Sequence, residues 1–144
     1  APIWATPLRS MALAWARLAG ADDYAERHPH IKRIHQAMVN HPIMIAGIGS
    51  FDTKLIEIGA GTWICKGGAE ACIGIAHLKY RMGIALKVHD GNHRPIPTAV
   101  TWIMSQLGWL SSEQSDAMAK WLITPIRNSH GDVVGCMRVR KWAS

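Results

Sequence analysis

Residues 71–92 read ACIGIAHLKYRMGIALKVHDGN, and the size and polarity of the side chains alternate along them. Larger apolar residues alternate with smaller or polar ones over 71–76 and again over 84–89, on either side of a polar turn at 79–83. A period of two residues is typical of strands with one buried face, so this stretch predicts an antiparallel hairpin. The Asp-Gly-Asn run at 90–92 then ends the second strand, because these residue types accept positive φ.

The segments on both sides of the hairpin have helical spacing. After Pro7, apolar side chains recur every three or four residues, and Gly20 stops that pattern. Similar patterns predict helices over 29–40, 51–58 and 100–107, a helix over 112–122 capped by Ser111 or Ser112, and a last strand over 133–140. Helices beside an antiparallel sheet indicate an α+β fold. No repeat or linker divides the sequence, so a single domain over 1–144 is expected.

Composition narrows the class of protein. The chain has 144 residues, of which 49% are hydrophobic and 18% charged, which supports a compact core and excludes an intrinsically disordered chain. Charged or turn residues interrupt every apolar stretch well short of the roughly 20 residues that span a bilayer, so no membrane association is expected. Cys65, Cys72 and Cys136 form no CxxC pair, which predicts free, buried thiols in a reducing, cytoplasmic setting.

A formal charge of +6 raises the question of nucleic-acid binding. The basic residues are scattered, however, and their densest groups are only 32–33 and 138–141. A solvated basic surface is the preferred interpretation, and nucleic acid is not expected as a partner. The histidines suggest metal binding, but His28, His30 and His35 have no acidic or cysteine partner at helical spacing, so no metal site is predicted.

One short motif, Lys66-Gly67-Gly68, stands just ahead of the first hairpin strand. Its two glycines let a substrate approach the backbone beside a lysine amine without meeting a Cβ atom. A lysine in such a place can take a proton from a serine or threonine hydroxyl, or it can stabilise a developing oxyanion. An ordinary surface lysine fits the same motif. The sequence contains no Ser-x-x-Lys and no Gly-x-Ser-x-Gly, so a complete catalytic set is not visible.

Six pieces of the chain match one known pattern in order and spacing. They are the end of a Gly-Cys-x-x-Pro segment at 1–8, the helix at 12–19, AMVNHPIMIAGIGSFDT at 37–53, Lys-Gly-Gly-Ala-Glu at 66–70, ALKVHDGN at 85–92 and PIRNSHGDVVG at 125–135. Together they make the chain resemble the bacterial asparaginase II family, typified by the inducible, thermolabile asparaginase of rhizobia.

This resemblance implies a fold like that of serine β-lactamases and glutaminases, and hydrolysis of the side-chain amide of L-asparagine to aspartate and ammonia. Members of the family use serine–lysine pairs. Lys66 matches the strand lysine of one pair, which implies proton transfer with the serine and oxyanion support. Gly67 and Gly68 are then expected to keep the strand edge open for substrate. Glu70 would either hold and tune the lysine or face solvent, and Asp90 would stabilise its own turn.

The family's serine nucleophiles lie in an N-terminal half that these residues do not match. The resemblance therefore implies the C-terminal half of an asparaginase, inactive alone, whose partners are L-asparagine, the missing N-terminal half and, in a homodimer, a second copy. Family members can bind zinc through two cysteines and a lysine, but no cysteine here matches those positions. No cofactor is expected in this chain, and zinc only in the complete enzyme. The alternative is a non-catalytic basic module or degenerate family remnant that binds nucleic acid or protein.

Overall fold

A computed structural model describes residues 5–24, 26 and 28–140 of the chain. The start of the first matched piece, residues 1–4, and the last residue of the basic group at 138–141 lie outside the described residues. The chain forms two compact units, residues 1–91 and residues 92–144. The single domain over 1–144 stays a prediction.

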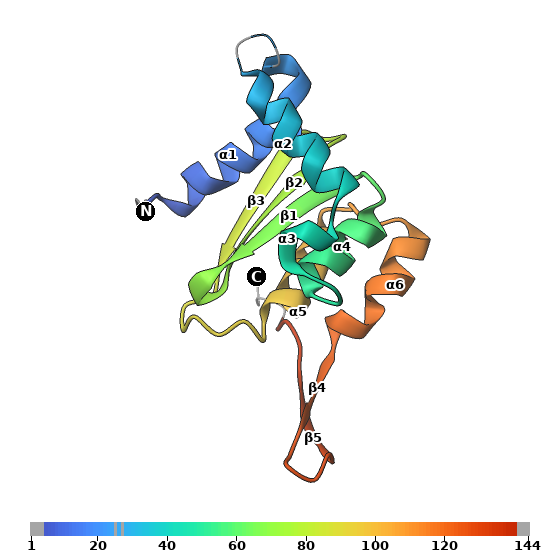
Figure 1. The fold of residues 1–144 in the computed structure, drawn as a ribbon. Coiled ribbons are helices and arrows are strands. Elements are labelled where there is room, and N and C mark those ends of the chain that lie inside the picture. Colours follow the sequence, from blue (N-terminus) through green and yellow to red (C-terminus); the bar gives the residue numbers. More distant parts are fainter. Residues whose placement is uncertain (1–4, 25, 27, 141–144) are drawn as a thin grey trace. The chain divides into compact units, whose positions relative to one another are not determined.

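The first unit is built on an antiparallel sheet of β1 (Trp63–Gly68), β2 (Cys72–His77) and β3 (Met82–Lys87), in that spatial order (Figure 1). β2 and β3 confirm the predicted hairpin. β1 is an addition to the predicted elements, and it forms one edge of the sheet. Its pairing with β2 places Lys66 opposite Gly74.

The first unit also contains α-helices and short 3-10 segments. In chain order they are α1 (Leu8–Ala19), the 3-10 helix η1 (Ala21–Tyr24), α2 (Pro29–Asn40), α3 (Ile43–Ala46), α4 (Phe51–Gly59) and the 3-10 turn η2 (Ala69–Ala71). α1 and α2 confirm the predicted first and second helices, and α4 confirms the predicted helix after the glycine-rich turn. α3 is a further addition.

Different helices cover the two faces of the sheet. Ile64 belongs to a buried cluster with Met38 of α2. Its neighbour Trp63 is also buried, but it donates its indole N–H to the carbonyl of Leu55 in α4 at 2.8 Å. Because successive strand residues point to opposite faces, α4 covers the face opposite to the one that α2 covers.

Glycines let α1 come unusually close to the sheet. A Cβ atom on Gly74 would stand 1.6 Å from Nε1 of Trp15, and one on Gly83 would stand 2.0 Å from the carbonyl oxygen of Ala12. Neither distance is compatible with a side chain. The glycines of β2 and β3 therefore set how closely α1 packs on the sheet.

The second unit contains two helices and a hairpin: α5 (Ile96–Gln106), α6 (Ser112–Leu122), β4 (Thr124–Arg127) and β5 (Val133–Met137). Ser111 caps α6, because its hydroxyl accepts the N–H of Gln114 while the Gln114 side chain accepts the N–H of Ser111. Of the two serines predicted as candidate caps, Ser111 is therefore the cap of α6. β4 is not among the predicted elements, and it pairs with β5.

These elements confirm the α+β fold class, and the relation to serine β-lactamases stays a prediction. The prediction of buried thiols is confirmed for Cys65, which is fully buried. Cys72 is only half-buried, and the prediction is wrong for Cys136, which is exposed. Cys136 is exposed because β5 belongs to a hairpin whose residues are nearly all exposed. In the part of the chain that the structure describes, no helix is both long and apolar enough to cross a membrane.

Candidate active site

Lys66 lies on the edge strand β1 with its side chain exposed. The residue before it, Cys65, is buried, and the residue after it, Gly67, is half-buried. The lysine amine donates to the carbonyl oxygen of Gly67. The amine of Lys66 is therefore held beside Gly67 and is exposed to solvent.

An acidic residue that the motif reading did not single out lies against this strand. Asp52 stands in the first turn of α4, and its Oδ2 atom accepts the backbone N–H of Gly67 at 2.5 Å. The backbone carbonyl of the same aspartate accepts the thiol of Cys65 at 3.5 Å. Asp52 thus holds the residues on both sides of Lys66.

The two glycines of the motif have different surroundings. A Cβ atom on Gly67 would lie 3.0 Å from Oδ2 of Asp52, which is tighter than ordinary contact. A Cβ atom on Gly68 would lie 3.7 Å from the Cβ of Cys72, which is an ordinary van der Waals distance. A side chain at Gly67 would therefore require the carboxylate to move by a few tenths of an ångström, whereas the space at Gly68 would admit a small side chain.

The start of α4 is fixed by a network of hydroxyl groups. Ser50 caps the helix by accepting the N–H of Thr53. The hydroxyl of Thr53, which is buried, lies 2.7 Å from the carbonyl of Gly47 and 3.2 Å from that of Pro42. This network ties the turn before α4 to the helix, so the position of Asp52 is well defined.

Glu70 lies in the tight connection between β1 and β2. Its backbone is left-handed, with φ 56° and ψ 34°, and Ala71 follows with φ 52°. The amine of Lys87 donates to the carbonyl of Glu70 and, at 2.6 Å, to that of Val88. Within the described residues no ion pair joins the Glu70 carboxylate to Lys66. Left-handed residues other than glycine are strained, and such strain gathers at functional sites.

The turn predicted at Asp90 and Gly91 closes against Glu70. Gly91 has φ 74°, as predicted, and its N–H donates to the carbonyl of Val88 at 3.1 Å. A Cβ atom at this position would stand 2.5 Å from Oε2 of Glu70. Asp90 is exposed. The structure therefore brings Glu70 and Gly91 together at the end of the sheet that also carries Lys66.

Burial and two neighbouring charged groups shift the pKa of the Cys65 thiol. Burial raises its pKa well above the ordinary value, and the nearby carboxylate of Asp52 raises it further, while the Lys66 ammonium lowers it. A buried thiol that keeps its proton is a weak nucleophile. Cys65 is therefore a packing residue of the site rather than a reactive one.

One protein-family model covers the motif together with nearly all of the chain. The family model for L-asparaginase II matches residues 1–139, which is nearly the whole chain and includes all five predicted site residues. The chain belongs to the L-asparaginase II family. No curated protein matches it. Membership in this family supports an asparaginase-type amidohydrolase, with asparagine as the family's substrate.

Within this L-asparaginase II chain, Asp52 is the site residue that motif reasoning missed. The signal was present, because Asp52-Thr53 closes the family-like piece at 37–53. Nothing local in the sequence links that piece to the Lys-Gly-Gly motif. The link is the hydrogen bond from Gly67 to Asp52, which only the packing of α4 on β1 reveals.

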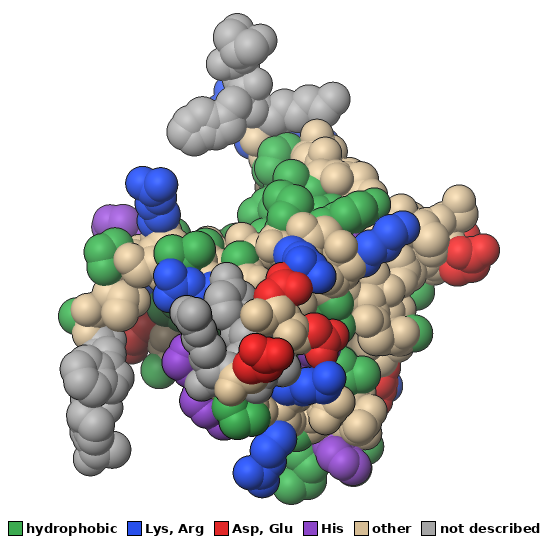
Figure 2. Space-filling model, turned by 90° about the horizontal axis from the view of Figure 1, so that it is seen from above, with side chains coloured by type: hydrophobic (Ala, Val, Ile, Leu, Met, Phe, Trp, Pro, Cys, Tyr) green, Lys and Arg blue, Asp and Glu red, His purple; other side chains and the backbone are tan. Residues whose placement is uncertain are grey.

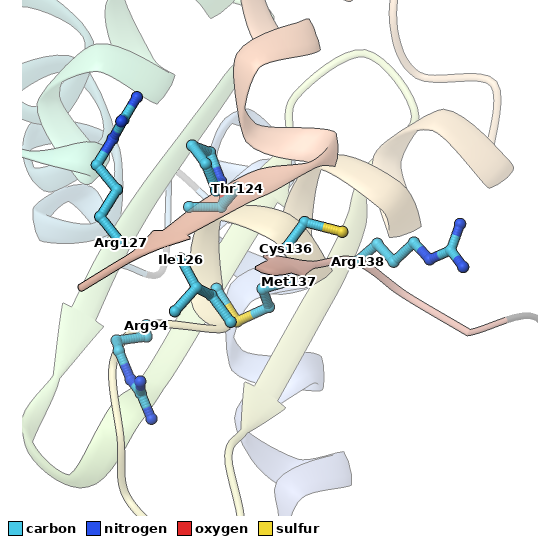
Figure 3. Close-up of a pocket in the computed structure, with 8 residues that line it drawn as sticks. Arg94, Thr124, Ile126, Arg127, Cys136, Met137 and Arg138 are labelled. Atoms are coloured by element: carbon cyan, nitrogen blue, oxygen red, sulfur yellow. The ribbon is translucent and has the colours of Figure 1, made fainter. Parts of the chain in front are cut away.

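A pocket lies in the other unit of the L-asparaginase II chain, and its lining comes from residues after the motif in the sequence. It has a volume of about 670 Å³ and is lined by Arg94, Thr124, Pro125, Ile126, Arg127, Cys136, Met137 and Arg138. Figure 3 shows the side chains of Arg94, Arg127 and Arg138 extending in different directions. The three guanidinium groups do not converge, and none of the predicted site residues lines this pocket.

The basic charge of the chain is dispersed. On the face seen in Figure 2, lysine and arginine side chains stand singly or beside acidic ones. Ion pairs join Lys32 to Asp22 at 2.8 Å, Lys54 to Glu57 at 2.7 Å and Arg81 to Asp23. Among the described residues no three histidine, cysteine or acidic side chains converge as metal ligands would.

Proposed function

We propose that this chain supplies the strand lysine of an asparagine amidohydrolase, and that Lys66 acts with a serine nucleophile carried by residues other than these. The observation that carries the proposal is the position of Lys66. It is exposed on an edge strand, with a glycine on its C-terminal side, in the Lys-Gly-Gly-Ala-Glu stretch that resembles the family's lysine motif. An edge strand leaves room for a second segment to bring a serine to the amine.

The proposed reaction is acyl transfer to serine. Once its amine has lost a proton, Lys66 takes the proton of the serine hydroxyl as the serine oxygen bonds to the amide carbon of the asparagine side chain. The tetrahedral oxyanion then breaks its carbon–nitrogen bond, and the lysine returns the proton to the nitrogen, which leaves as ammonia. Water attacks the resulting ester in the same way, and this step releases aspartate and the free serine.

Zinc has no role in the proposed steps, because the described residues do not provide a site that fits it. Cys65 is buried and protonated, Cys72 pairs in the sheet opposite Gly68, and Cys136 belongs to the other unit. No cluster of ligands converges among the described residues. A zinc ion in a complete enzyme would need ligands from other residues.

The test is substitution of Lys66 in the enzyme expressed from the complete reading frame that encodes these residues. Lys66→Ala is expected to lower kcat for asparagine by about 100-fold or more, the usual contribution of a general base. Lys66→Arg keeps the charge but cannot act as a base, so it is expected to lower kcat as well.

The matched control is Lys79→Ala, which removes another exposed lysine of the same unit from the turn after β2. It should leave kcat within about two-fold of the parent. A Lys66→Ala enzyme with kcat within a few-fold of the parent would refute the proposal.

A further inference from the structure

We infer that Asp52 is a positioning residue for Lys66, holding the strand on both sides of the lysine through the contacts of its carboxylate and its carbonyl. This inference rests on the proposed function of Lys66. Asp52 does not itself touch the reacting atoms. Its role is to fix where β1 presents the lysine.

The two contacts bracket the lysine. The Gly67 N–H donates to Oδ2 of Asp52 at 2.5 Å, and the Cys65 thiol donates to the Asp52 carbonyl at 3.5 Å. A charge-assisted bond to a backbone N–H is stronger than a neutral one. The carboxylate contact is therefore the main restraint, and the thiol contact is the weaker second point.

An edge strand needs such a restraint. Among the described residues β1 pairs with β2 on one side only, so its outward N–H groups have no partner strand there. The carboxylate of Asp52 accepts the Gly67 N–H on that open side. The residue that follows Lys66 therefore has a hydrogen-bond partner that fixes its position at the edge.

Asp52 is itself rigidly held. It stands in the first turn of α4, where a negative charge is favourable beside the unpaired N–H groups of the helix. The residues beside it in the cap, Ser50 and Thr53, are hydrogen-bonded to each other and to the preceding turn. Gly67 lets the carboxylate come close, since a Cβ atom would lie 3.0 Å from it.

Electrostatics support the same picture. Burial is the main cause of the raised pKa of the Cys65 thiol, the Asp52 carboxylate raises this pKa further, and Lys66 lowers it. Both charged side chains therefore lie near the same sulfur atom of β1.

The first experiment measures the contact without activity. In the complete enzyme with isotope-labelled glycine, the amide proton of Gly67 is expected to lie further upfield in Asp52→Asn than in the parent, because the charge-assisted hydrogen bond to the carboxylate is lost. The matched control, Glu57→Gln on the same helix, should leave this signal where it is in the parent. A Gly67 signal that is the same in Asp52→Asn and in the parent would overturn the inference.

The second experiment separates positioning from a general effect on folding. Asp52→Ala is expected to lower kcat for asparagine by about 10-fold to 100-fold with KM changed less than about three-fold, because a misplaced base slows the chemistry. Asp52→Asn retains an acceptor oxygen and should recover part of the loss. If Asp52→Ala does not fold, the comparison of Asp52→Asn with Glu57→Gln decides the question. Equal kcat for that pair would count against positioning.

The outcomes also separate this inference from the proposed function. An inactive Lys66→Ala enzyme beside an Asp52→Ala enzyme with parental kcat removes the positioning role and leaves the lysine role intact. An active Lys66→Ala enzyme removes the proposed function, whatever the Gly67 signal shows.

Discussion

The carboxylate of Glu70 fills the space that a side chain at Gly91 would need, with Oε2 only 2.5 Å from where a Cβ atom would stand. Gly91 also has a left-handed backbone, with φ 74°. The positive φ favours glycine at this position, and an added Cβ atom would in addition have to displace the Glu70 carboxylate, which ends an exposed side chain. The contact joins the connection after the Lys-Gly-Gly motif to the turn after β3.

Gly91→Ala is expected to destabilise the fold by about 1–2 kcal/mol, the cost of a left-handed alanine, with a small addition because the Glu70 carboxylate must move. The matched control is Gly61→Ala, because Gly61 has φ 85° and no atom near its missing Cβ. The difference between the two free energies of unfolding, measured in urea, reports the clash with Glu70. In a Glu70→Ala background that difference should vanish; a difference that persists would place the cause elsewhere.

Gly74→Ala is expected to destabilise the first unit by about 3 kcal/mol or more, because the new methyl group would overlap the indole of Trp15 on α1. Gly68→Ala should change the free energy of unfolding by no more than about 0.5 kcal/mol, since its Cβ would meet Cys72 at an ordinary distance. Thermal or urea unfolding of both variants checks the pair. Equal losses would contradict the tight packing of α1 on β2.

Acid is expected to destabilise the fold through His77. This side chain is buried, and burial lowers its pKa below the ordinary value of 6.5. Its Nδ1 atom accepts the N–H of Tyr80 at 3.3 Å. A backbone hydrogen bond raises the pKa and the positive charge of Lys79 lowers it, but burial has the largest effect. The unfolded chain therefore binds a proton more readily, and stability should fall as the pH drops below 6.5.

The measurement is the free energy of unfolding between about pH 7 and pH 5, the range in which histidine titrates. His77→Gln should make the loss of stability with acid shallower. Burial also lowers the pKa of His35, so part of the slope should remain. His130→Gln, a change in an exposed turn, should leave the slope unchanged. An identical slope in the parent and in His77→Gln would show that His77 does not titrate as argued.

Binding to nucleic acid is expected to be weak and non-specific. The basic residues are scattered, and Lys32, Lys54 and Arg81 are paired with acidic groups. Fluorescence anisotropy of a labelled single-stranded DNA, measured between about 50 and 200 mM salt, should show no appreciable binding. A steep decrease of affinity with salt would instead support the alternative of a basic binding module.

The elements predicted from sequence were those whose signals are local. α1 and α2 have apolar residues at helical spacing and end at Gly20 and before Pro42, and the Ser111 cap marks the start of α6. The β2–β3 hairpin alternates with the two-residue period of a half-buried strand. Each of these signals lies within a dozen residues of the element that it predicts.

The strands that were missed lack such a signal. In β1 the first three residues, Trp63 to Cys65, are all buried, and the last three include two glycines, so no alternation is visible. β4 is four residues long, contains Pro125, and is almost wholly exposed. A short strand becomes recognisable only through its partner, and the partner is a matter of tertiary pairing.

The sequence by itself determined the longer helices, the hairpin and the α+β class, and its resemblance to the L-asparaginase II family is confirmed over residues 1–139. Only the tertiary structure decided that β1 forms the sheet edge and that Asp52 lies against Gly67. The reason is physical. Periodicity and caps act between residues a few positions apart, whereas the bond from Gly67 to Asp52 forms only when α4 packs on β1 and a glycine leaves room for the carboxylate.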